Sequence, residues 1–581
     1  MVVRSYLVVA CALALAAGPL WAADVTLSAN AAQARKPISP WIYGRNENGN
    51  ISAISNATSR RMGGNRWTAY NWENNASNAG ADYFYYNDGF LSNSLTPGEA
   101  VRPTITSTSA NRQAVIVTVP MAGYVSADKF GTTVQQADYA TINPANPLTG
   151  GIAGSRFRTV IDRKPASAGP LSLTPNTTDA FVYTDEFVNW VKTTGGNRST
   201  PVIYSLDNEP DLWASTHRQI RWNPATNSPV PISYDELRQR SINTALAIKS
   251  VDPTAMVFGA VNYGWQGYRT LQHAPNRPNQ DFHQYFLQQM KLADTANGKR
   301  LVDAIDIHYY PEARGTYTTG GNSRIIEGAA LSSTDPAMIQ ARVQSTRSLW
   351  DPTYVETSWI TQWSTGGQAM RVIPRLQADI NAFYPGTKIA ITEYTFGGGN
   401  HISGATAQAD ALGIFGQQGV YAANVWDLQA SNTENRFVRA GFDMFLNYDG
   451  AGGRFGDTSV QSASSDVSKV TFYASVDAED PDRIVLMIIN KTAGTLTADL
   501  SLLNFGTTFS NIRGYQLAGT STTPSLFINQ SLIGLAGLPT LSLQPYSVSA
   551  VQLFGYSTVP EPGAVAPLAV LAALLGRRRR N

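Results

Sequence analysis

The chain has 581 residues, more than the roughly 250–300 that usually share one hydrophobic core, so we expect two domains. Hydrophobic residues make up 43% and charged residues 15% of the chain, which excludes an intrinsically disordered protein. The formal net charge is +2, and five basic residues and one acidic residue lie within residues 1–23 and 556–581, which leaves −2 for the rest. A nearly neutral body argues against a nucleic-acid partner.

Residues 1–23 have the pattern of a secretory signal peptide. Arg4 precedes an apolar run, Tyr6–Ala17, and the small pair Ala22-Ala23 provides a cleavage site. Cleavage there removes Cys11, the only cysteine, so the exported chain would have no disulfide. Cys11 also leaves open a lipoprotein signal, which the short apolar run before it disfavours.

Residues 24–40 begin with a strand-like segment that we expect to join a C-terminal β-sandwich, and residues 41–455 are expected to form a (β/α)8 barrel. Helix-period segments at Ser233–Ser250, Asp281–Ala296 and Ala405–Gln417 separate strand-like runs, and Ser233 and Glu236 have capping-box spacing. The second of the eight runs has the weakest signal. The runs are Trp41–Asn46, Arg60–Arg66, Ala114–Tyr124, Pro201–Pro210, Met256–Gly264, Ala304–Pro311, Lys388–Phe396 and Val420–Leu428.

Four of these runs end in polar residues. In a barrel, the C-terminal ends of the strands share one face, and that face carries the active site. The four runs agree independently, so together they predict one polar site at that face. The ends read Asp207-Asn208-Glu209, His308-Tyr309-Tyr310, Thr392-Glu393-Tyr394 and Trp426-Asp427.

Residues 456–555 have a different residue pattern, because long helix-period segments are absent and short runs of alternating apolar and polar residues take their place. These runs, separated by Gly, Pro, Asn and Thr, predict a β-sandwich. They are Lys469–Val476, Ile484–Ile489, Leu496–Leu502 and Ser547–Phe554.

Residues 556–581 contain Pro560-Glu561-Pro562, an apolar run over Ala564–Gly576 and the basic cluster Arg577–Arg580. This segment resembles a PEP-CTERM sorting tail, which implies recognition by sorting machinery at the inner membrane. A plain membrane anchor is the alternative, but the apolar run falls short of the roughly 20 residues that span a bilayer. With the signal peptide, the tail predicts an exported protein of the periplasm, cell surface or extracellular space.

Glu209 and Glu393 are the candidate catalytic residues. Each follows an apolar strand-like run, and the two would face each other across the barrel mouth as the ends of the fourth and seventh strands. Hydrolysis of a glycosidic bond with retention of configuration needs two carboxylates about 5–5.5 Å apart. Asn208 precedes Glu209 and can bind the sugar 2-hydroxyl, while Pro210 fixes the direction of the chain. A surface carboxylate at a strand end is the structural alternative for Glu209, and the matching Glu393 disfavours it.

Several segments resemble glycoside hydrolase family 44 over about residues 25–555. The resemblance implies a retaining barrel enzyme with an appended β-sandwich that cleaves β-1,4-glucans such as xyloglucan, with Glu209 as acid/base and Glu393 as nucleophile. The segments are Arg61–Arg66 with Tyr70–Asn75, Pro120–Tyr124, Leu206–Trp213 with Thr216-His217, Asp306–Glu312, and Ile391–Tyr394 with Gly397–Gly404.

Other aromatic and polar side chains are candidates for substrate binding. Tyr310 is expected to hydrogen-bond Glu393, and His308 to contact the substrate or Glu393. Trp426 is expected to line a sugar subsite. Trp359 lies with Trp350 and Trp363 in the long connection between the sixth and seventh strands, a length typical of functional loops. Each of these residues has packing or a structural role as its alternative.

A metal is not required for this chemistry. Asn71, Glu73, Asn75 and Asp82 nevertheless offer oxygen atoms of the kind calcium prefers, so a structural calcium ion is an open alternative, with Glu73 and Asp82 as the candidate ligands.

The function predicted from the sequence is therefore an exported retaining endo-β-1,4-glucanase, expected to be a monomer acting on a β-1,4-linked plant polysaccharide. A β-mannanase or xylanase of the same mechanism remains an alternative. So does a non-catalytic, carbohydrate-binding surface protein, which would not need two glutamates at strand ends.

Overall fold

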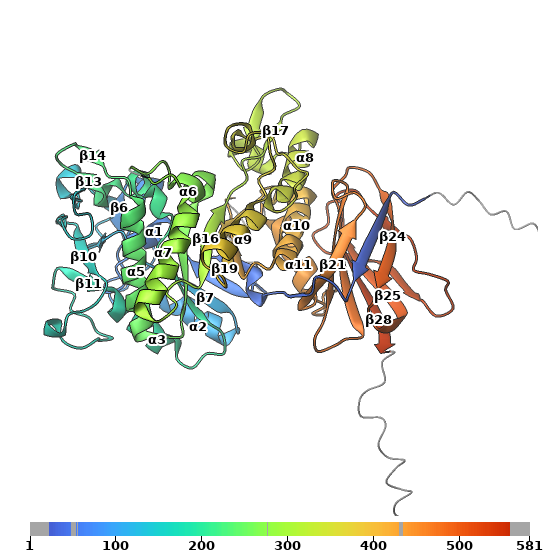
Figure 1. Ribbon diagram of the computed structural model, residues 1–581, viewed down its shortest axis with the longest axis horizontal. Coiled ribbons are helices and arrows are strands. Elements are labelled where there is room, and N and C mark those ends of the chain that lie inside the picture. Colours follow the sequence, from blue (N-terminus) through green and yellow to red (C-terminus); the bar gives the residue numbers. More distant parts are fainter. Residues whose placement is uncertain (1–21, 48–53, 55, 276, 429–433, 558–581) are drawn as a thin grey trace, which may run out of the picture.

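The computed structural model describes residues 22–47, 54, 56–275, 277–428 and 434–557, so nearly all of the expected signal peptide and sorting tail lies outside the described residues. Figure 1 shows two bodies side by side, a barrel with its helices on the left and a β-rich domain on the right. The N-terminal strand β1 (Val25–Asn30) lies in the β-rich domain, beside strands from the end of the chain. No helix among the described residues is both long and apolar enough to cross a membrane.

Eight parallel strands close into a barrel in chain order. Each of the eight expected runs overlaps one of them, which confirms the predicted barrel. Their interior positions are filled by buried side chains, with Ile116, Ile203 and Phe258 forming a cluster of their own. The strands are β3 (Gly44–Asn46), β4 (Ser59–Met62), β7 (Ala114–Val119), β12 (Val202–Leu206), β15 (Met256–Tyr263), β16 (Ala304–Tyr309), β19 (Lys388–Tyr394) and β20 (Ala422–Val425).

The second strand, β4, is shorter than the expected run, because it ends at Met62 and helix α1 (Asn65–Thr68) follows at once. The break falls at Gly64, whose φ of 93° is disfavoured for residues with a side chain. A Cβ on Gly64 would also come within 2.6 Å of the Trp426 ring. The turn therefore requires glycine, and it brings Trp426 against the end of β4.

Helices cover the outside of the barrel, and Figure 1 shows α3, α5 and α7 in front of it. The helices expected at Ser233–Ser250, Asp281–Ala296 and Ala405–Gln417 correspond to α5, α7 and α10. The longer helices are α2 (Arg102–Ala110), α3 (Thr184–Gly195), α5 (Tyr234–Val251), α7 (Phe282–Asn297), α8 (Pro336–Ser345), α9 (Val372–Phe383), α10 (Ile402–Gln418) and α11 (Arg436–Leu446). The shorter ones are α1, α4 (Trp213–Thr216) and α6 (Gly264–Thr270).

The start of α5 forms only half of the expected capping box. The Ser233 hydroxyl accepts a hydrogen bond from the backbone N–H of Glu236 (3.1 Å), as predicted. The Glu236 carboxylate, however, binds Arg221 and Arg240 instead of the backbone of Ser233. These two arginines outweigh the effect of burial and lower the pKa of Glu236 to about 2. The carboxylate therefore ties α5 to the loop after β12.

Small sheets and hairpins extend from the loops at the C-terminal ends of the barrel strands. The β16–β19 connection forms a separate lobe at the top of Figure 1, with β17 and α8 in it. These loop strands are β5 (Ser77–Asn78), β6 (Tyr86–Asp88), β8 (Tyr124–Ser126), β9 (Thr132–Thr133), β10 (Phe157–Ile161), β11 (Phe181–Tyr183), β13 (Trp222–Asn223), β14 (Ser228–Pro229), β17 (Arg314–Thr316) and β18 (Asn322–Arg324).

The β-rich domain is built around β21, which pairs with β1 through its second half and with β22 through its first half. Its strands follow the hydrogen-bonded order β26-β25-β28-β23-β22-β21-β1-β24-β27 and share a core that includes Leu27, Phe472 and Leu486. Besides β1, the strands are β2 (Lys36–Pro37), β21 (Thr458–Ser464), β22 (Val470–Val476), β23 (Arg483–Asn490), β24 (Leu496–Leu503), β25 (Thr507–Leu517), β26 (Ser525–Ser531), β27 (Leu541–Leu543) and β28 (Val548–Ser557).

The barrel and the β-rich domain share a continuous apolar interface. Figure 1 shows α10 and α11 between the two bodies. Tyr473, Val485 and Met487, from β22 and β23, belong to the same buried cluster as Leu412 and Phe415 of α10. Both faces of β22 and β23 are therefore covered, which explains why the two strands are almost entirely buried.

A buried ion pair crosses this interface. Lys491 Nζ lies 3.4 Å from Asp410 Oδ2, and both side chains are fully buried. Asp410 also accepts hydrogen bonds from the hydroxyls of Thr346 (2.5 Å), Thr471 (2.5 Å) and Tyr473 (2.7 Å). Burial lowers the pKa of Lys491, and the negative charge of Asp410 opposes that shift. The pair links α10 of the barrel to the end of β23.

Replacing Lys491 by Met should destabilise the protein by roughly 3–5 kcal/mol, because Asp410 would stay buried without its counter-ion. Lys469→Met is the matched control, since Lys469 is half-exposed beside Asp466 (3.3 Å) and such a pair contributes at most about 1 kcal/mol. Urea unfolding of both variants measures the difference. Equal losses in the two variants would show that the buried pair has no special role.

Candidate active site

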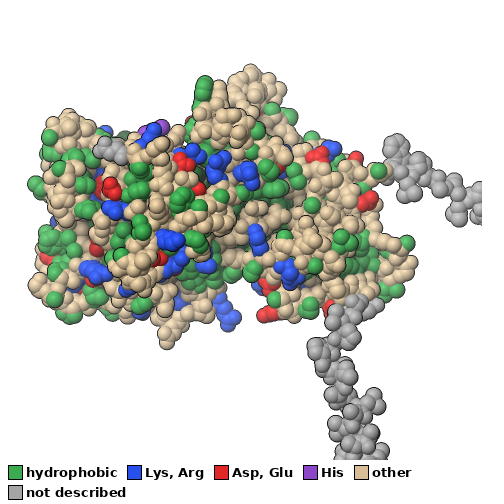
Figure 2. All heavy atoms as spheres, in the orientation of Figure 1, with side chains coloured by type: hydrophobic (Ala, Val, Ile, Leu, Met, Phe, Trp, Pro, Cys, Tyr) green, Lys and Arg blue, Asp and Glu red, His purple; other side chains and the backbone are tan. Residues whose placement is uncertain are grey.

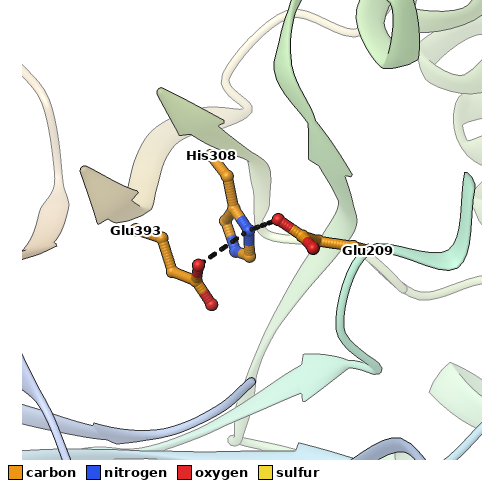
Figure 3. Close-up of side chains that lie close together, drawn as sticks. All are labelled: Glu209, His308 and Glu393. Carbon is orange, nitrogen blue, oxygen red and sulfur yellow. Dashed lines mark hydrogen bonds and ion pairs between the residues drawn. The ribbon is translucent and has the colours of Figure 1, made fainter. Parts of the chain in front are cut away.

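Glu209, His308 and Glu393 meet at the C-terminal end of the barrel, although Glu209 lies in the turn after β12 and the other two lie on β16 and β19. Figure 3 shows His308 between the two glutamates. One side-chain N or O atom of each residue lies within 4.8 Å of those of the other two. All three side chains are buried. The structure therefore brings together the two carboxylates that the sequence predicts as a pair.

The backbone after β12 is held in an unusual conformation that directs Glu209 into this site. Asp207 and Glu209 have φ values of 65° and 44°, which are uncommon for residues other than glycine. The buried Asp207 carboxylate fixes the turn by accepting hydrogen bonds from the Thr68 hydroxyl (2.6 Å) and the backbone N–H groups of Asn208 (2.7 Å) and Met121 (2.5 Å). The Glu209 N–H donates to the Val261 carbonyl (3.1 Å).

Glu393 has strong positive and hydrogen-bonding partners. Arg61 Nη1 donates to Glu393 Oε1 (2.7 Å), and the Tyr310 hydroxyl donates to Oε2 (2.7 Å), as predicted for Tyr310. His308 Nδ1 lies 3.4 Å from the same Oε2. Burial raises the pKa of Glu393, while Arg61 and Tyr310 lower it by stabilising the ionised carboxylate.

Glu209 has a different environment, because its closest partner is the neutral ring of His308, with Nδ1 2.8 Å from Oε1. Burial raises the pKa of Glu209 well above its usual value, and the negative charge of Glu393 raises it further. Burial also lowers the pKa of His308, so that its imidazole is neutral. The arrangement therefore favours a proton on Glu209 and a negative charge on Glu393.

Asn208 precedes Glu209 and is linked to Glu393 through Arg61. Its Oδ1 accepts hydrogen bonds from Arg61 Nη2 (2.9 Å) and from the backbone N–H of Gly64 (3.0 Å). Because the oxygen is occupied, the amide Nδ2 is left to donate to a bound ligand.

The two predicted tryptophans lie at different parts of the site. Trp426 is half-buried against Gly64, beside the end of β4. Trp359 lines a cavity of about 110 Å³ together with Tyr310, Tyr263 and Trp265. Tyr310 lines this cavity and also donates its hydroxyl to Glu393, so this one residue connects the cavity of Trp359 with the carboxylate pair.

Three residues of the site had no role predicted from the sequence: Arg61, Asp306 and Thr392. Arg61 is fully buried in the barrel, where it binds Asn46 as well as Asn208 and Glu393. The signal available in the sequence was an arginine within the expected second strand run, Arg60–Arg66. Thr392 donates its hydroxyl to Asp306, and the same hydroxyl oxygen lies 3.3 Å from His308 Nε2.

The four residues considered for calcium do not converge. Asn71 and Asn75 use their side chains to hold loop backbone and the Tyr70 hydroxyl. Asp82 accepts a hydrogen bond from Asn65 (2.8 Å), and its negative charge raises the pKa values of Glu209 and Glu393. Glu73 instead lies near Asp179 and Glu186. Glu73 and Asp82 therefore have different charged neighbours, and the calcium site stays a prediction.

Comparisons with known proteins agree on one family. Residues 76–313 match the model of glycoside hydrolase family 44. The chain is 43% identical over 486 residues to an endoglucanase A of Paenibacillus lautus, with 81% of this chain and 64% of that protein covered. It is 40% identical over 494 residues to a β-mannanase/endoglucanase A of Caldicellulosiruptor saccharolyticus, with 81% of this chain and 34% of that protein covered. The chain thus spans less than two thirds of either relative.

Solved structures extend the match across the whole fold. A family 44 xyloglucanase of Paenibacillus polymyxa, determined with xyloglucan, superposes with a TM-score of 0.81 at 34% identity. That match covers 92% of this chain and 100% of the xyloglucanase chain. A family 44 endoglucanase of Clostridium thermocellum gives a TM-score of 0.80 at 37% identity with the same coverage.

Proposed function

The chain belongs to glycoside hydrolase family 44, and we propose that it is a retaining endo-β-1,4-glucanase acting on xyloglucan, carboxymethylcellulose or a similar glucan. The observation that carries this proposal is the buried pair Glu209 and Glu393, whose facing atoms lie within 4.8 Å and whose surroundings differ in charge. Such a spacing suits direct attack by one carboxylate and leaves no room for the water of an inverting mechanism.

In the first step, Glu393 is the nucleophile and Glu209 the general acid. The Glu393 carboxylate forms a bond to the anomeric carbon while the glycosidic C–O bond breaks. The electron pair of that bond goes to the leaving oxygen, which takes the proton of Glu209. Arg61 and Tyr310 hold the Glu393 carboxylate ionised and in position for attack.

In the second step, Glu209 is the general base. Its carboxylate removes a proton from water, the water oxygen attacks the anomeric carbon, and the bond to Glu393 breaks. Glu209 is then protonated again, and the product keeps its β configuration.

Substrate contacts are proposed for the groups that border this pair. Asn208 Nδ2 is placed to donate to the sugar 2-hydroxyl, because its oxygen is held by Arg61 and Gly64. Trp426 and Trp359 offer flat apolar surfaces for sugar faces. Tyr310 and His308 act on the two glutamates, with His308 between them.

A β-mannanase activity is the second candidate, because one relative carries both mannanase and endoglucanase in its name. A xylanase of the same mechanism is also compatible with the two carboxylates. A purely carbohydrate-binding protein is disfavoured, since it would have no use for a buried, strained and unequally charged glutamate pair.

A parallel reducing-sugar assay on xyloglucan, carboxymethylcellulose, mannan and xylan tests the proposed activity. We expect the fastest turnover on one of the two glucans, and a decrease of roughly 10²–10⁴-fold in Glu209→Gln, which cannot protonate the leaving group. Asp235→Asn is the control, because Asp235 is an exposed carboxylate on α5. Preference for mannan would select the second candidate, and wild-type protein inactive on all four polymers would contradict both.

The chemistry proposed here requires no cofactor. A structural calcium ion is a separate proposal: of the two predicted candidates, Glu73 and Asp82, it keeps Glu73, and Glu186, whose charge acts on Glu73, takes the place of Asp82. Glu73 is buried, and burial together with the charges of Asp179 and Glu186 raises its pKa to about 8. Glu186 Oε1 accepts a hydrogen bond from Lys164 (2.5 Å), but its buried Oε2 has no hydrogen-bond partner. A hard cation between these carboxylates would relieve their repulsion.

Thermal unfolding with and without a chelator tests this site. Calcium at 100 times its Kd should stabilise the protein by roughly 2.7 kcal/mol, so that EDTA lowers Tm and added Ca²⁺ restores it. Glu73→Gln should no longer respond to calcium, while Asp82→Asn should respond like the wild type. Identical Tm values in EDTA and in Ca²⁺ would remove the ion from the account.

Export remains a proposal from the sequence, as do processing of the tail by inner-membrane sorting machinery and a monomeric state. The proposed partner is a β-1,4-linked plant polysaccharide, which the near-neutral charge of the chain suits better than nucleic acid.

A further inference from the structure

A chain of buried polar groups runs from Glu209 into the barrel interior. His308 Nδ1 lies 2.8 Å from Glu209 Oε1, and His308 Nε2 lies 3.3 Å from the Thr392 hydroxyl oxygen. That hydroxyl lies 2.8 Å from Asp306 Oδ2, and the Thr392 backbone N–H donates to Asp306 Oδ1 (3.1 Å). Asp306, His308 and Thr392 are fully buried, so these groups meet the carboxylate pair only through His308 Nδ1, which lies 2.8 Å from Glu209 Oε1 and 3.4 Å from Glu393 Oε2.

Along this series of hydrogen bonds, the protonation of each group determines which atom of the next group donates. An ionised Asp306 can only accept, so the Thr392 hydroxyl gives its proton to Asp306 and presents lone pairs to His308. His308 is neutral and has a single ring N–H, which must then lie on Nε2. Nδ1 is left as an acceptor facing Glu209 Oε1. The contact is favourable only if Glu209 carries the proton.

These hydrogen bonds run in the opposite direction if Asp306 is protonated and becomes a donor. The Thr392 hydroxyl then donates to His308 Nε2, the ring proton moves to Nδ1, and Nδ1–H stabilises an ionised Glu209. Both glutamates would then be carboxylates on either side of one N–H group. The protonation state of Asp306 therefore selects which form of Glu209 the site favours.

We propose that Asp306 is a positioning residue that, when ionised, acts through Thr392 and His308 to keep the proton on Glu209. This inference rests on the acid/base role of Glu209 proposed above. Asp306 does not touch the carboxylate pair directly in this series, because Thr392 and His308 lie between it and Glu209. Its function is to set the tautomer of His308.

The electrostatic surroundings support an ionised Asp306 at the alkaline limb of activity. Burial raises the pKa of Asp306 to about 7, while Arg61 and the two donors of Thr392 oppose the rise. Burial and Glu393 place the pKa of Glu209 well above its usual value. The other titratable or charged groups facing Glu209 or Asp306 are Arg61 on β4, Asp82 in the loop before β6, Asp211 after β12, Tyr268 on α6, His308 on β16, Tyr310 after β16 and Glu393 on β19.

Asp306→Asn reverses the direction of these hydrogen bonds, and the new side chain has nearly the same shape as the old one. The amide oxygen must face the Thr392 backbone N–H, so the amide NH₂ donates to the Thr392 hydroxyl, which then donates to His308 Nε2. The resulting Nδ1–H stabilises ionised Glu209 and lowers its pKa. Activity that needs protonated Glu209 is lost as pH rises through that pKa, so the alkaline limb of kcat/KM should move down by about one pH unit or more.

Thr392 provides a matched pair of variants. Thr392→Val removes the hydroxyl and leaves His308 free to place its proton on Nδ1 between the two glutamates, so the alkaline limb should again move down. Thr392→Ser keeps the hydroxyl and should keep the wild-type limb. The profiles are measured on the polysaccharide that the wild type cleaves fastest, and circular dichroism and Tm identify any variant that does not fold.

The tautomer itself can be read by ¹⁵N NMR of imidazole-labelled protein, because the chain has only five histidines. The His308 signals, assigned by their absence from His308→Asn, should show the proton on Nε2 in the wild type and on Nδ1 in Asp306→Asn. A wild-type proton on Nδ1, or an alkaline limb unmoved in folded Asp306→Asn and Thr392→Val, would overturn the inference. Both results leave the assignment of Glu209 and Glu393 intact, which fails only if their own variants remain active.

Discussion

The ion pair between Arg61 and Glu393 distinguishes two buried carboxylates that would otherwise be similar. Arg61 Nη1 lies 2.7 Å from Glu393, and the same guanidinium holds Asn208 next to Glu209. A single cation therefore keeps one carboxylate ionised and positions the backbone that carries the other. Because Arg61 is fully buried, its charge acts with little screening by water. Without this interaction, the two glutamates, whose side-chain atoms lie within 4.8 Å of each other, would have more similar affinities for a proton.

The rest of the fold holds these groups in register. His308 and Glu393 lie near the ends of strands whose neighbours are fixed by the closed barrel, and Glu209 lies in a turn after β12 that the Asp207 carboxylate holds. The β-rich domain supports the same face indirectly. Its strands pack on α10, and Gln408 of that helix donates to the hydroxyl of Tyr394, the residue after Glu393 (2.8 Å). The domain is thus an integral part of the barrel's structure.

The barrel, the carboxylate pair and the hydrogen bond of Tyr310 could be predicted from sequence, because strand periodicity places polar strand ends on one face. Arg61 could not be assigned, since nothing local shows that an arginine on the second strand reaches the seventh. Asp306 and Thr392 were missed for the same reason: their link to His308 exists only across β16 and β19. The calcium alternative stays a prediction, and the two asparagines considered for it already use their side chains to hold loop backbone. Local patterns reveal elements and exposed chemistry, whereas the partners of buried charges depend on closure of the barrel.

The most direct test of the central claim is the configuration of azide products from two variants given an activated aryl β-glucoside or cellobioside. Glu209→Ala can still form the glycosyl-enzyme on Glu393, and azide, which needs no general base, should then give the β-glycosyl azide. Glu393→Ala cannot form that intermediate, so azide entering the vacated space should give the α-glycosyl azide. Proton NMR of the anomeric position distinguishes the two. An α-azide from Glu209→Ala would exchange the two roles and contradict the account built on Arg61 and Glu393.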